Sequence, residues 1–244
     1  VPLILHEANA VPGKAVEQLA RFAKAVAISF LGTATMLKHH YTVLTGMPVR
    51  TSLAGAPPLD GFSNTDFTVL VTGGSQGAHR VNKLACEAFC DLQQSGMQGL
   101  RVIHQCGKTD VDWIRERYVA AGVNALVVPF LQEMGRAYAS AKLVIARAGA
   151  ATCAELALCG VPAIFIPLPT AIRDHQRLNA EMVANDGASI IMLEKDTDAG
   201  ILAQQIRALR DKPDQLVQMG KKMLTKARPN AAARLADLVE KPFA

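Results

Sequence analysis

The sequence predicts an α/β protein whose larger part is a doubly wound parallel sheet. The chain has 244 residues, of which 50% are hydrophobic and 19% charged, so it can bury a substantial core. From residue 66 onward, short apolar runs alternate with helical segments, which is the order of βαβ units. The apolar runs lack polar alternation, as strands covered on both faces do. Ligands of such sheets bind beyond the carboxyl ends of the strands.

The beginning of the chain predicts part of a second, Rossmann-like domain. Residues 2–5 predict a strand, residues 13–27 have helical composition, and residues 41–44 form a further β-prone piece. Residues 51–65 are rich in proline, glycine, serine and asparagine, which is typical of a linker. The expected division is therefore a partial domain at 1–50, a linker at 51–65, a domain at 66–228, and a C-terminal helix at 229–244 that packs back on the first domain.

The elements of the larger domain follow from apolar runs separated by turn residues. The last helical region divides at Pro213, because proline cannot continue a helix but suits the first turn of one. Strands are expected at 67–72, 100–104, 126–130, 143–146, 163–166 and 189–193, with helices that begin at 78, 110, 132, 151 and 174, two more within 199–228, and a final one at 230–240.

The segment 146–179 predicts a ligand site. Gly149 breaks a buried strand, and the next ten residues have helical composition with Gly160 as the stop. A helix start carries unpaired N–H groups and a partial positive charge, so Ala150, Ala151 and Thr152 can bind an anion such as pyrophosphate.

Glu155 is the only charged residue of this apolar helix. A buried lone charge costs several kcal/mol unless it is paired or hydrogen-bonded, which favours a role in ligand binding over a solvated carboxylate. The carboxylate can accept from two vicinal hydroxyls, as acidic residues of dinucleotide sites do for ribose. The neighbouring Arg147 can pair with Glu155 or meet the base and phosphate, and the sequence does not choose. Gln176 and Asn179 offer amides to sugar hydroxyls; alternatively, residues of their loop cap the helix that begins near residue 174.

The run TGGSQG at 72–77 follows a strand and precedes a helix. In that context glycine amides and Ser75 can approach a phosphate, although a tight strand-to-helix turn explains the same residues. The run Gly107-Lys108-Thr109 resembles the end of a nucleotide-triphosphate loop, but Val102 replaces the required first glycine, which excludes an ATPase.

Metal chemistry is not expected. Asp110 and Asp112 imitate a metal-binding pair, but Asp110 stands where a helix N-cap belongs, and capping is favoured. Cys86 and Cys90 have the spacing of a helical metal pair without a second pair, so packing is favoured. We predict no cofactor and no metal held by protein ligands, although magnesium can accompany a diphosphate.

Charge and amino-acid composition limit the classes of ligand and cellular location that are expected for this chain. The net charge of +5 favours anionic ligands or an anionic membrane surface, and basic residues cluster only at Lys221, Lys222, Lys226 and Arg228. Nucleic acid is not expected, because aromatic residues do not alternate with a basic patch. Five dispersed cysteines fit a reducing compartment. Neither a signal peptide nor a transmembrane helix is expected, since glycine and proline interrupt the longest charge-free run, 156–172.

Four ordered motifs together resemble a known family. HEANAVPG at 6–13, MPVR at 47–50 and VTGGSQGA at 71–78, with the segment 146–179, closely resemble the MurG family of glycosyltransferases, family 28. The resemblance covers nearly the whole chain. It implies a GT-B fold and inverting transfer of N-acetylglucosamine from UDP-N-acetylglucosamine to the 4-hydroxyl of undecaprenyl-pyrophosphoryl-N-acetylmuramoyl-pentapeptide, which converts lipid I into lipid II in peptidoglycan synthesis. It further implies a peripheral location on the cytoplasmic face of the bacterial plasma membrane.

The resemblance also implies roles for individual residues. Asn9 and Arg50 match substrate contacts, Leu131 matches a backbone contact to uracil, and Gln176 matches a contact to the donor sugar; the family also places Ser75 at the donor or the domain cleft. Two positions depart from the family pattern: Ala8 stands where glutamine is frequent, and Met47 where asparagine is usual. The resemblance leaves the catalytic base unknown, since the family's main candidates lie in a glycine-rich N-terminal loop; within this chain Glu7, which follows His6, is a candidate.

The family opens with a glycine-rich loop ending in histidine, which is not found from Val1 onward. We therefore expect a C-terminal part of a longer enzyme that binds donor and transfers sugar weakly or not at all. One alternative is another UDP-sugar enzyme on the same scaffold, either a glycolipid glycosyltransferase or a 2-epimerase. The other is a non-catalytic donor-binding subunit.

Overall fold

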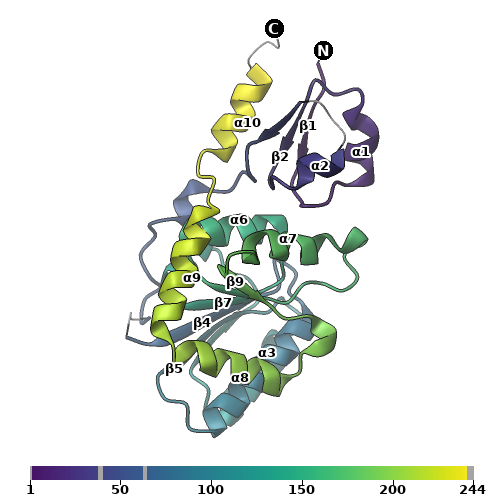
Figure 1. The fold of residues 1–244 in the computed structure, drawn as a ribbon. Coiled ribbons are helices and arrows are strands. Elements are labelled where there is room, and N and C mark those ends of the chain that lie inside the picture. Colours follow the sequence, from purple (N-terminus) through teal and green to yellow (C-terminus); the bar gives the residue numbers. More distant parts are fainter. Residues whose placement is uncertain (1, 38–40, 63–64, 241–244) are drawn as a thin grey trace.

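The computed structural model describes residues 2–37, 41–62 and 65–240, which form two parallel β-sheets (Figure 1). Residues 63–64 of the expected linker and residues 241–244 of the expected C-terminal segment lie outside the described residues. Helices cover both faces of each sheet (Figure 1). The predicted α/β class with a doubly wound, Rossmann-like parallel sheet is confirmed.

The smaller sheet has the order β1-β2-β3, with β1 at Ile4–Glu7, β2 at Ala25–Ile28 and β3 at Thr42–Leu44. Alternate residues of β2 point to opposite faces. Val26 and Ile28 pack with helices α1 (Lys14–Ala20) and α2 (Thr33–Leu37). The small Ala25 and Ala27 face the other side, where helix α10 (Ala231–Glu240) packs against them through Leu235 and Leu238.

Two expectations for this region are wrong. The helix expected over 13–27 ends at Ala20, and its last part is instead strand β2. Ala25–Ile28 is 0–1% exposed between β1 and β3, so pairing in a buried sheet overrides its helical composition. The first strand lies two residues later than expected, which places His6 and Glu7 within β1 and not after it.

The larger sheet has the order β6-β5-β4-β7-β8-β9, with all neighbours parallel. Every strand expected in this domain is present, with ends shifted by at most two residues. The strands are β4 (Phe67–Thr72), β5 (Leu100–Gln105), β6 (Ala125–Val128), β7 (Leu143–Ala146), β8 (Ala163–Phe165) and β9 (Ser189–Ile191).

Two helical layers sandwich this sheet (Figure 1). Along β4, Val69 and Val71 face one layer and Leu70 faces the other. The layer toward the smaller sheet holds α5 (Met134–Ser140), α6 (Ala150–Cys159) and α7 (His175–Ala184). The opposite layer holds α3 (His79–Gln94), α4 (Val111–Ala121) and α8 (Ala199–Arg210), and α9 (Pro213–Thr225) contributes to both cores.

The described part of the expected linker packs on the larger domain. It contains the 3-10 turn Thr51–Leu53, and Leu53 is 4% exposed. The Leu59 amide donates to Ser140 Oγ at 2.9 Å, and Arg136 donates to the Pro58 carbonyl and pairs with Asp60 at 2.6 Å. Linker composition therefore coexists here with a fixed path along α5.

The cysteines are free thiols, and four of the five are buried. Cys86 and Cys90 lie in the apolar core that α3 forms with the sheet. Burial raises the pKa of the Cys86 thiol to about 12 and that of Cys106 to about 11, so both are protonated packing residues at neutral pH. No helix among the described residues combines the length and apolar character needed to cross a bilayer.

Candidate functional site

The strand order of the larger sheet reverses between β4 and β7. From β4 the chain proceeds outward through β5 and β6, and from β7 it proceeds in the other direction through β8 and β9. Such a switch point leaves a crevice beyond the carboxyl ends of the two central strands, where ligands of doubly wound sheets bind. The turn at 73–77 follows β4 and helix α6 follows β7, so the two predicted phosphate-binding segments flank this crevice.

The turn at 73–77 requires glycine for close backbone packing. Gly77 has φ +78°, and a Cβ atom on it would lie 2.1 Å from the Cys106 carbonyl oxygen. From the other side, a Cβ atom on Gly107 would lie 2.4 Å from the Gln76 carbonyl oxygen. Ser75 lies exposed at the crest of this turn. The backbone of one loop thus supports the other, and the hydroxyl of Ser75 is left accessible to a ligand.

Helix α6 begins without a side-chain cap. Its N-cap residue Gly149 is extended and has no side chain to accept from the helix amides. The Cys153 amide donates to the Gly149 carbonyl oxygen at 2.9 Å, so the three preceding amides belong to the part of a helix that lacks intrahelical acceptors. Of these three residues Ala150 is buried, Thr152 half-buried and Ala151 exposed.

Glu155 is half-buried one turn further along α6. Its Oε2 atom accepts a hydrogen bond from the Tyr138 hydroxyl of α5 at 2.8 Å. Tyr138 is 2% exposed, and burial, together with the charge of Glu155, raises the pKa of Tyr138 well above its usual value. The phenol therefore remains a donor that orients the carboxylate.

Leu131 lies in the middle of the segment 129–133 between β6 and α5 and is 8% exposed. Its backbone amide donates to Gln105 Oε1 at 3.0 Å. Gln105 is the last residue of β5 and also contacts the turn at 73–77. The predicted uracil contact is thus tied to the predicted phosphate contact through one side chain.

Arg147 does not pair with Glu155. Its guanidinium pairs with Glu194 Oε2 at 2.6 Å and donates to the carbonyl oxygens of Ile166 and Pro167 at 3.0 Å each. Arg147 is 9% exposed, so these contacts provide a buried guanidinium with an anionic partner and two hydrogen-bond acceptors. Of the two alternatives that the sequence leaves open, pairing with Glu155 is excluded, and the side chain instead holds the segment after β8.

The predicted residues of the smaller domain hold one loop together. Glu7 is 4% exposed, and its carboxylate accepts from the amides of Asn9 (2.9 Å) and Gly13 (2.8 Å). Asn9 Oδ1 accepts from Asn179 Nδ2 at 3.1 Å. Both carboxylate oxygens of Glu7 are engaged by this loop, which gives the residue a positioning role in this structure.

Asn179 links the two domains. Its Oδ1 atom accepts from the Ala10 amide at 2.8 Å, and its Nδ2 atom also donates to the Ala148 carbonyl oxygen at 3.1 Å. Asn179 is 0% exposed, so its amide, which was expected to meet sugar hydroxyls, here joins the loop after β1 to the segment before α6. Arg173 adds a second link, donating to the Pro12 carbonyl oxygen at 2.9 Å and pairing with Glu17 at 2.7 Å.

Of the two remaining predicted donor contacts, Gln176 is hydrogen-bonded within the larger domain, whereas Arg50 is exposed to solvent. Gln176 stands in the first turn of α7, and its Oε1 atom accepts from the Leu168 amide at 3.0 Å. The residues before it, Arg173 and Asp174, have φ values of +56° and +57°, which non-glycine residues rarely adopt. Such strain is frequent at functional sites. Arg50 is exposed just before the 3-10 turn at Thr51–Leu53.

Asp110 holds the N-cap position of α4, but its side chain makes no capping bond, which corrects the expected role. It accepts instead from Trp113 Nε1 at 2.9 Å, Asn82 Nδ2 at 2.7 Å and His79 Nδ1 at 2.9 Å. Burial raises the pKa of Asp110, but these hydrogen bonds outweigh it and lower the pKa below its usual value. Capping failed as a prediction because His79 and Asn82 of α3, together with Trp113 of α4, donate to the carboxylate in place of the helix amides.

Among the residues that the structure describes, no group of three or more histidine, cysteine, aspartate or glutamate side chains is arranged to hold a metal ion. Asp112 points into solvent and pairs with Arg115 at 3.4 Å.

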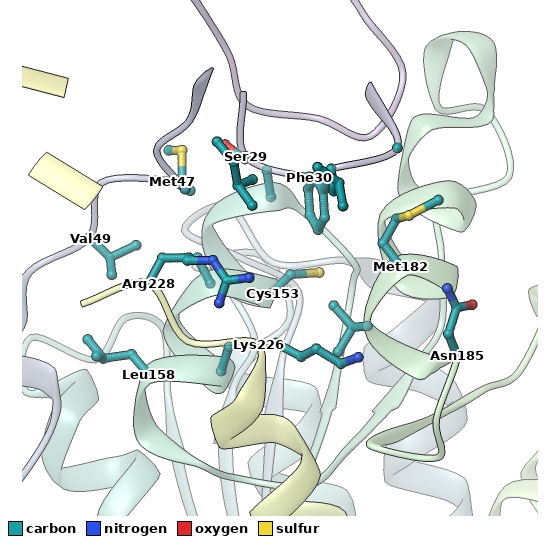
Figure 2. Close-up of a pocket in the computed structure, with 18 residues that line it drawn as sticks. Ser29, Phe30, Met47, Val49, Cys153, Leu158, Met182, Asn185, Lys226 and Arg228 are labelled. Atoms are coloured by element: carbon teal, nitrogen blue, oxygen red, sulfur yellow. The ribbon is translucent and has the colours of Figure 1, made fainter. Parts of the chain in front are cut away.

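A cavity of about 360 Å³ lies between the smaller sheet and the helices α6 and α7 (Figure 2). Its lining is mostly apolar, and Arg228 and Lys226 reach toward it from the segment between α9 and α10 (Figure 2). Of the predicted site residues only Ala150 lines it. The cavity therefore adjoins the crevice at the start of α6, but Ser75, Leu131 and Glu155 do not line it.

Sequence reasoning missed two residues that support the candidate site, Gln105 and Tyr138, and it gave Thr72, the first residue of the run at 72–77, no role of its own. A signal exists for Gln105, because a polar His-Gln pair directly follows the apolar Val102 and Ile103 at the end of the strand run LRVIHQ. Tyr138 carries no comparable signal, since a tyrosine in a short helix is usually a packing residue.

Comparison with family models gives one match over most of the chain. The model of the glycosyltransferase family 28 C-terminal domain matches residues 68–235. The match spans the larger sheet from the second residue of β4 onward and the helices around it.

Curated relatives extend the likeness to the smaller domain. The UDP-N-acetylglucosamine--N-acetylmuramyl-(pentapeptide) pyrophosphoryl-undecaprenol N-acetylglucosamine transferase of Stutzerimonas stutzeri is 42% identical over 240 residues. The protein of the same name from Geobacter sulfurreducens is 39% identical over 240 residues. The alignments cover 98% and 97% of this chain and 66% of each relative, so the chain spans just under two thirds of their length.

Solved structures share the fold. The crystal structure of Acinetobacter baumannii MurG aligns with a TM-score of 0.84 and 33% identity, covering 99% of this chain and 68% of that one. The Staphylococcus aureus MnaA–UDP structure aligns with a TM-score of 0.72 over 98% of this chain and 69% of that one, but at 14% identity, so it supports the fold alone.

Proposed function

This chain belongs to glycosyltransferase family 28, and from that premise we propose that its larger domain binds UDP-N-acetylglucosamine. The whole protein would transfer N-acetylglucosamine to the 4-hydroxyl of undecaprenyl-pyrophosphoryl-N-acetylmuramoyl-pentapeptide. The reaction converts lipid I into lipid II and inverts the configuration at C1. Relatives that carry this activity in their names are 39–42% identical, whereas the 2-epimerases among the similar structures are 13–14% identical. The transferase is therefore favoured over the epimerase.

The observation that carries the proposal is the juxtaposition of an uncapped helix start and a half-buried carboxylate at the switch point. The amides of Ala150, Ala151 and Thr152 offer donors to a diphosphate. Glu155, one turn later and oriented by Tyr138, offers acceptors to the two ribose hydroxyls. Leu131 provides the backbone contact to uracil, and Ser75 stands on the turn across the crevice. Together these groups match the diphosphate, the ribose and the uracil of uridine diphosphate.

The same groups account for how UDP can leave. As the acceptor 4-hydroxyl attacks C1, the bond from C1 to the diphosphate oxygen breaks and negative charge grows on UDP. Donors fixed at a helix start stabilise that charge without reorganising, an effect worth about 3 kcal/mol per well-placed donor in other enzymes. The proposal assigns this role to the start of α6 and to the turn at 73–77.

Gln176 and Asn9 complete the sugar end of the proposed site. Gln176 begins α7 beside a backbone segment with positive φ angles. Asn9 and Asn179 join the two domains there, so we assign them to the closure of the cleft around the sugar. Arg50 is exposed just before the 3-10 turn Thr51–Leu53, and we assign it to a contact with the donor. Glu7 holds the Asn9 loop, and we do not assign it the base.

The proposal includes a peripheral site of action at the cytoplasmic face of the bacterial plasma membrane, since the proposed acceptor is a membrane lipid. The net charge of +5 supports attraction to anionic lipids. We propose residues 1–50 as part of the acceptor domain, 51–65 as the connection, 66–228 as the donor domain and 229–244 as a helix that returns to the acceptor domain. The packing of Leu235 and Leu238 on the smaller sheet supports the last assignment.

Calorimetric titration of the 244-residue chain tests the proposal. We expect saturable binding of UDP-N-acetylglucosamine and UDP, and binding of ADP that is at least about tenfold weaker, because a purine does not fit a site that reads uracil through one backbone segment. ADP is the matched control, since it carries the same diphosphate and ribose. Equal affinity for ADP and UDP, or no saturable binding by a folded chain, would contradict the proposed donor.

A further inference from the structure

We propose that Gln105 is a positioning residue. Its single buried side-chain amide fixes the distance between the turn at 73–77 and the backbone of Leu131, in the segment between β6 and α5. The inference rests on the proposed function, because it concerns the phosphate end and the base end of the same donor site. It adds a residue that the sequence motifs do not mark.

The geometry of Gln105 carries the inference. It ends β5, between β4 and β6, and is 1% exposed. Its Nε2 atom donates to Thr72 Oγ1 at 3.2 Å and to the Gly74 carbonyl oxygen at 2.9 Å. Its Oε1 atom accepts from the Leu131 amide at 3.0 Å. Both N–H groups and the carbonyl oxygen of the Gln105 side chain thus form hydrogen bonds that hold two loops proposed to face the ligand.

Thr72 reinforces the phosphate end of this connection. Its Oγ1 atom also accepts from the Gly74 amide at 3.2 Å. Gly74 is therefore held at both of its backbone groups, the amide by Thr72 and the carbonyl by Gln105. Gly74 has φ +90° with nothing within 4 Å of a Cβ position, so packing does not hold it in place. The hydrogen bonds of Thr72 and Gln105 provide that restraint.

The connection matters because the two loops contact one covalent ligand. Uracil and diphosphate are separated by a ribose of fixed size, so both ends bind well only when the loops keep the matching distance. Supporting residues of this kind set the precision of a site although they do not touch the ligand. The inference therefore predicts that the two ends of the ligand respond differently to different changes around Gln105.

Thr68 provides a matched control on the same strand. It lies four residues before Thr72, so both side chains project from the same face of β4. Thr68 is 0% exposed, and its Oγ1 atom has no hydrogen-bond partner. Replacing either threonine with valine makes the same chemical change in a buried strand, but only Thr72→Val removes contacts to Gly74 and Gln105.

The test measures the dissociation constants of UDP and uridine for Thr72→Val, Gln105→Met and Thr68→Val. We expect Thr72→Val to weaken UDP about tenfold and leave uridine unchanged, since it frees only the phosphate end. Gln105→Met should weaken both ligands, because it also releases Leu131. Thr68→Val should change neither, and Thr72→Ser, which keeps the hydroxyl, should retain the affinity of the unaltered chain.

Two results would overturn the inference while leaving the donor site in place. One is UDP binding within twofold of the unaltered chain by folded Thr72→Val and Gln105→Met. The other is an equal loss of UDP and uridine affinity in Thr72→Val. If Gln105→Met does not fold, Thr72→Val against Thr68→Val decides alone. Failure of the unaltered, folded chain to bind UDP overturns both this inference and the proposed function.

Discussion

Replacing Gly77 with alanine is expected to lower the free energy of unfolding by roughly 3 kcal/mol and to weaken UDP binding at least about tenfold. The added Cβ would lie 2.1 Å from the Cys106 carbonyl oxygen and 2.7 Å from its carbon, and both are backbone atoms that cannot rotate away. The residue also has φ +78°, which costs a non-glycine residue about 1–2 kcal/mol. Relief requires the turn at 73–77 to move away from Cys106, and Ser75 moves with it.

Gly74→Ala is the matched control for stability, because Gly74 belongs to the same turn and has φ +90°, yet a Cβ on it meets nothing within 4 Å. It should cost only the conformational part, about 1–2 kcal/mol. Gly122→Ala, which caps α4 at φ +71° in open space, gives the same reference outside the site. Urea unfolding measures all three. Equal losses for Gly77 and Gly74 would show that the contact with Cys106 does not constrain the turn.

Replacing Glu155 with alanine is expected to raise the dissociation constant of UDP by about a hundredfold. The estimate assumes two charge-assisted hydrogen bonds to ribose, each worth about 1.5 kcal/mol. The loss should be specific to the ribose hydroxyls. Calorimetry with UDP and 2′-deoxy-UDP checks this, because the unaltered chain should prefer UDP and Glu155→Ala should bind the two nucleotides equally.

Three variants separate the ligand contact from structural effects. Glu155→Gln keeps an acceptor for the Tyr138 hydroxyl but loses the charge, so it should fall between alanine and the unaltered chain. Tyr138→Phe removes the donor that orients the carboxylate and should lose part of the ribose preference. Glu116→Gln changes an exposed carboxylate of α4 and should bind normally. A Glu155→Ala chain that keeps both its UDP affinity and its ribose preference would remove Glu155 from the site.

Local patterns predicted the elements of the larger domain well. Apolar runs without alternation correctly indicated strands covered on both faces, and Gly149, Gly160 and Pro213 stand at helix ends where they were expected. The same reasoning failed over residues 25–28. Alanine and valine there are compatible with a helix, and only the presence of β1 and β3 on either side makes a strand the better solution.

The candidate site could be proposed only in part from the sequence, because the residues proposed to face the ligand carry local signals and the residues that contact them do not. Gly149 after a buried strand indicates the start of α6, and Glu155 is recognisable as the only charged residue of an apolar helix. The partners of these residues come from distant parts of the chain. Tyr138 reaches Glu155 from another helix, and Gln105 joins loops 26 and 31 residues away. Such contacts depend on strand order, which the sequence pattern leaves open.

Asp110 also shows that a local sequence rule does not predict contacts with side chains from other elements. Its position before α4 is a good N-cap position, and the helix does begin at the next residue. The carboxylate nevertheless accepts from Asn82 and His79, which the packing of α3 against α4 brings within 3 Å, and from Trp113 in the first turn of α4. A local rule identified the helix boundary correctly and the side-chain contacts incorrectly.

The most direct test of the central claim is to locate UDP on the chain by mapping amide chemical shifts in a titration. We expect the largest changes at Ala150, Ala151 and Thr152, with further changes at Ser75 and Leu131, since these amides surround the crevice beyond β4 and β7. Changes confined to the cavity lined by Ser29, Ala150, Met182 and Arg228, with Ala151, Thr152, Ser75 and Leu131 unaffected, would contradict the assignment of the donor site.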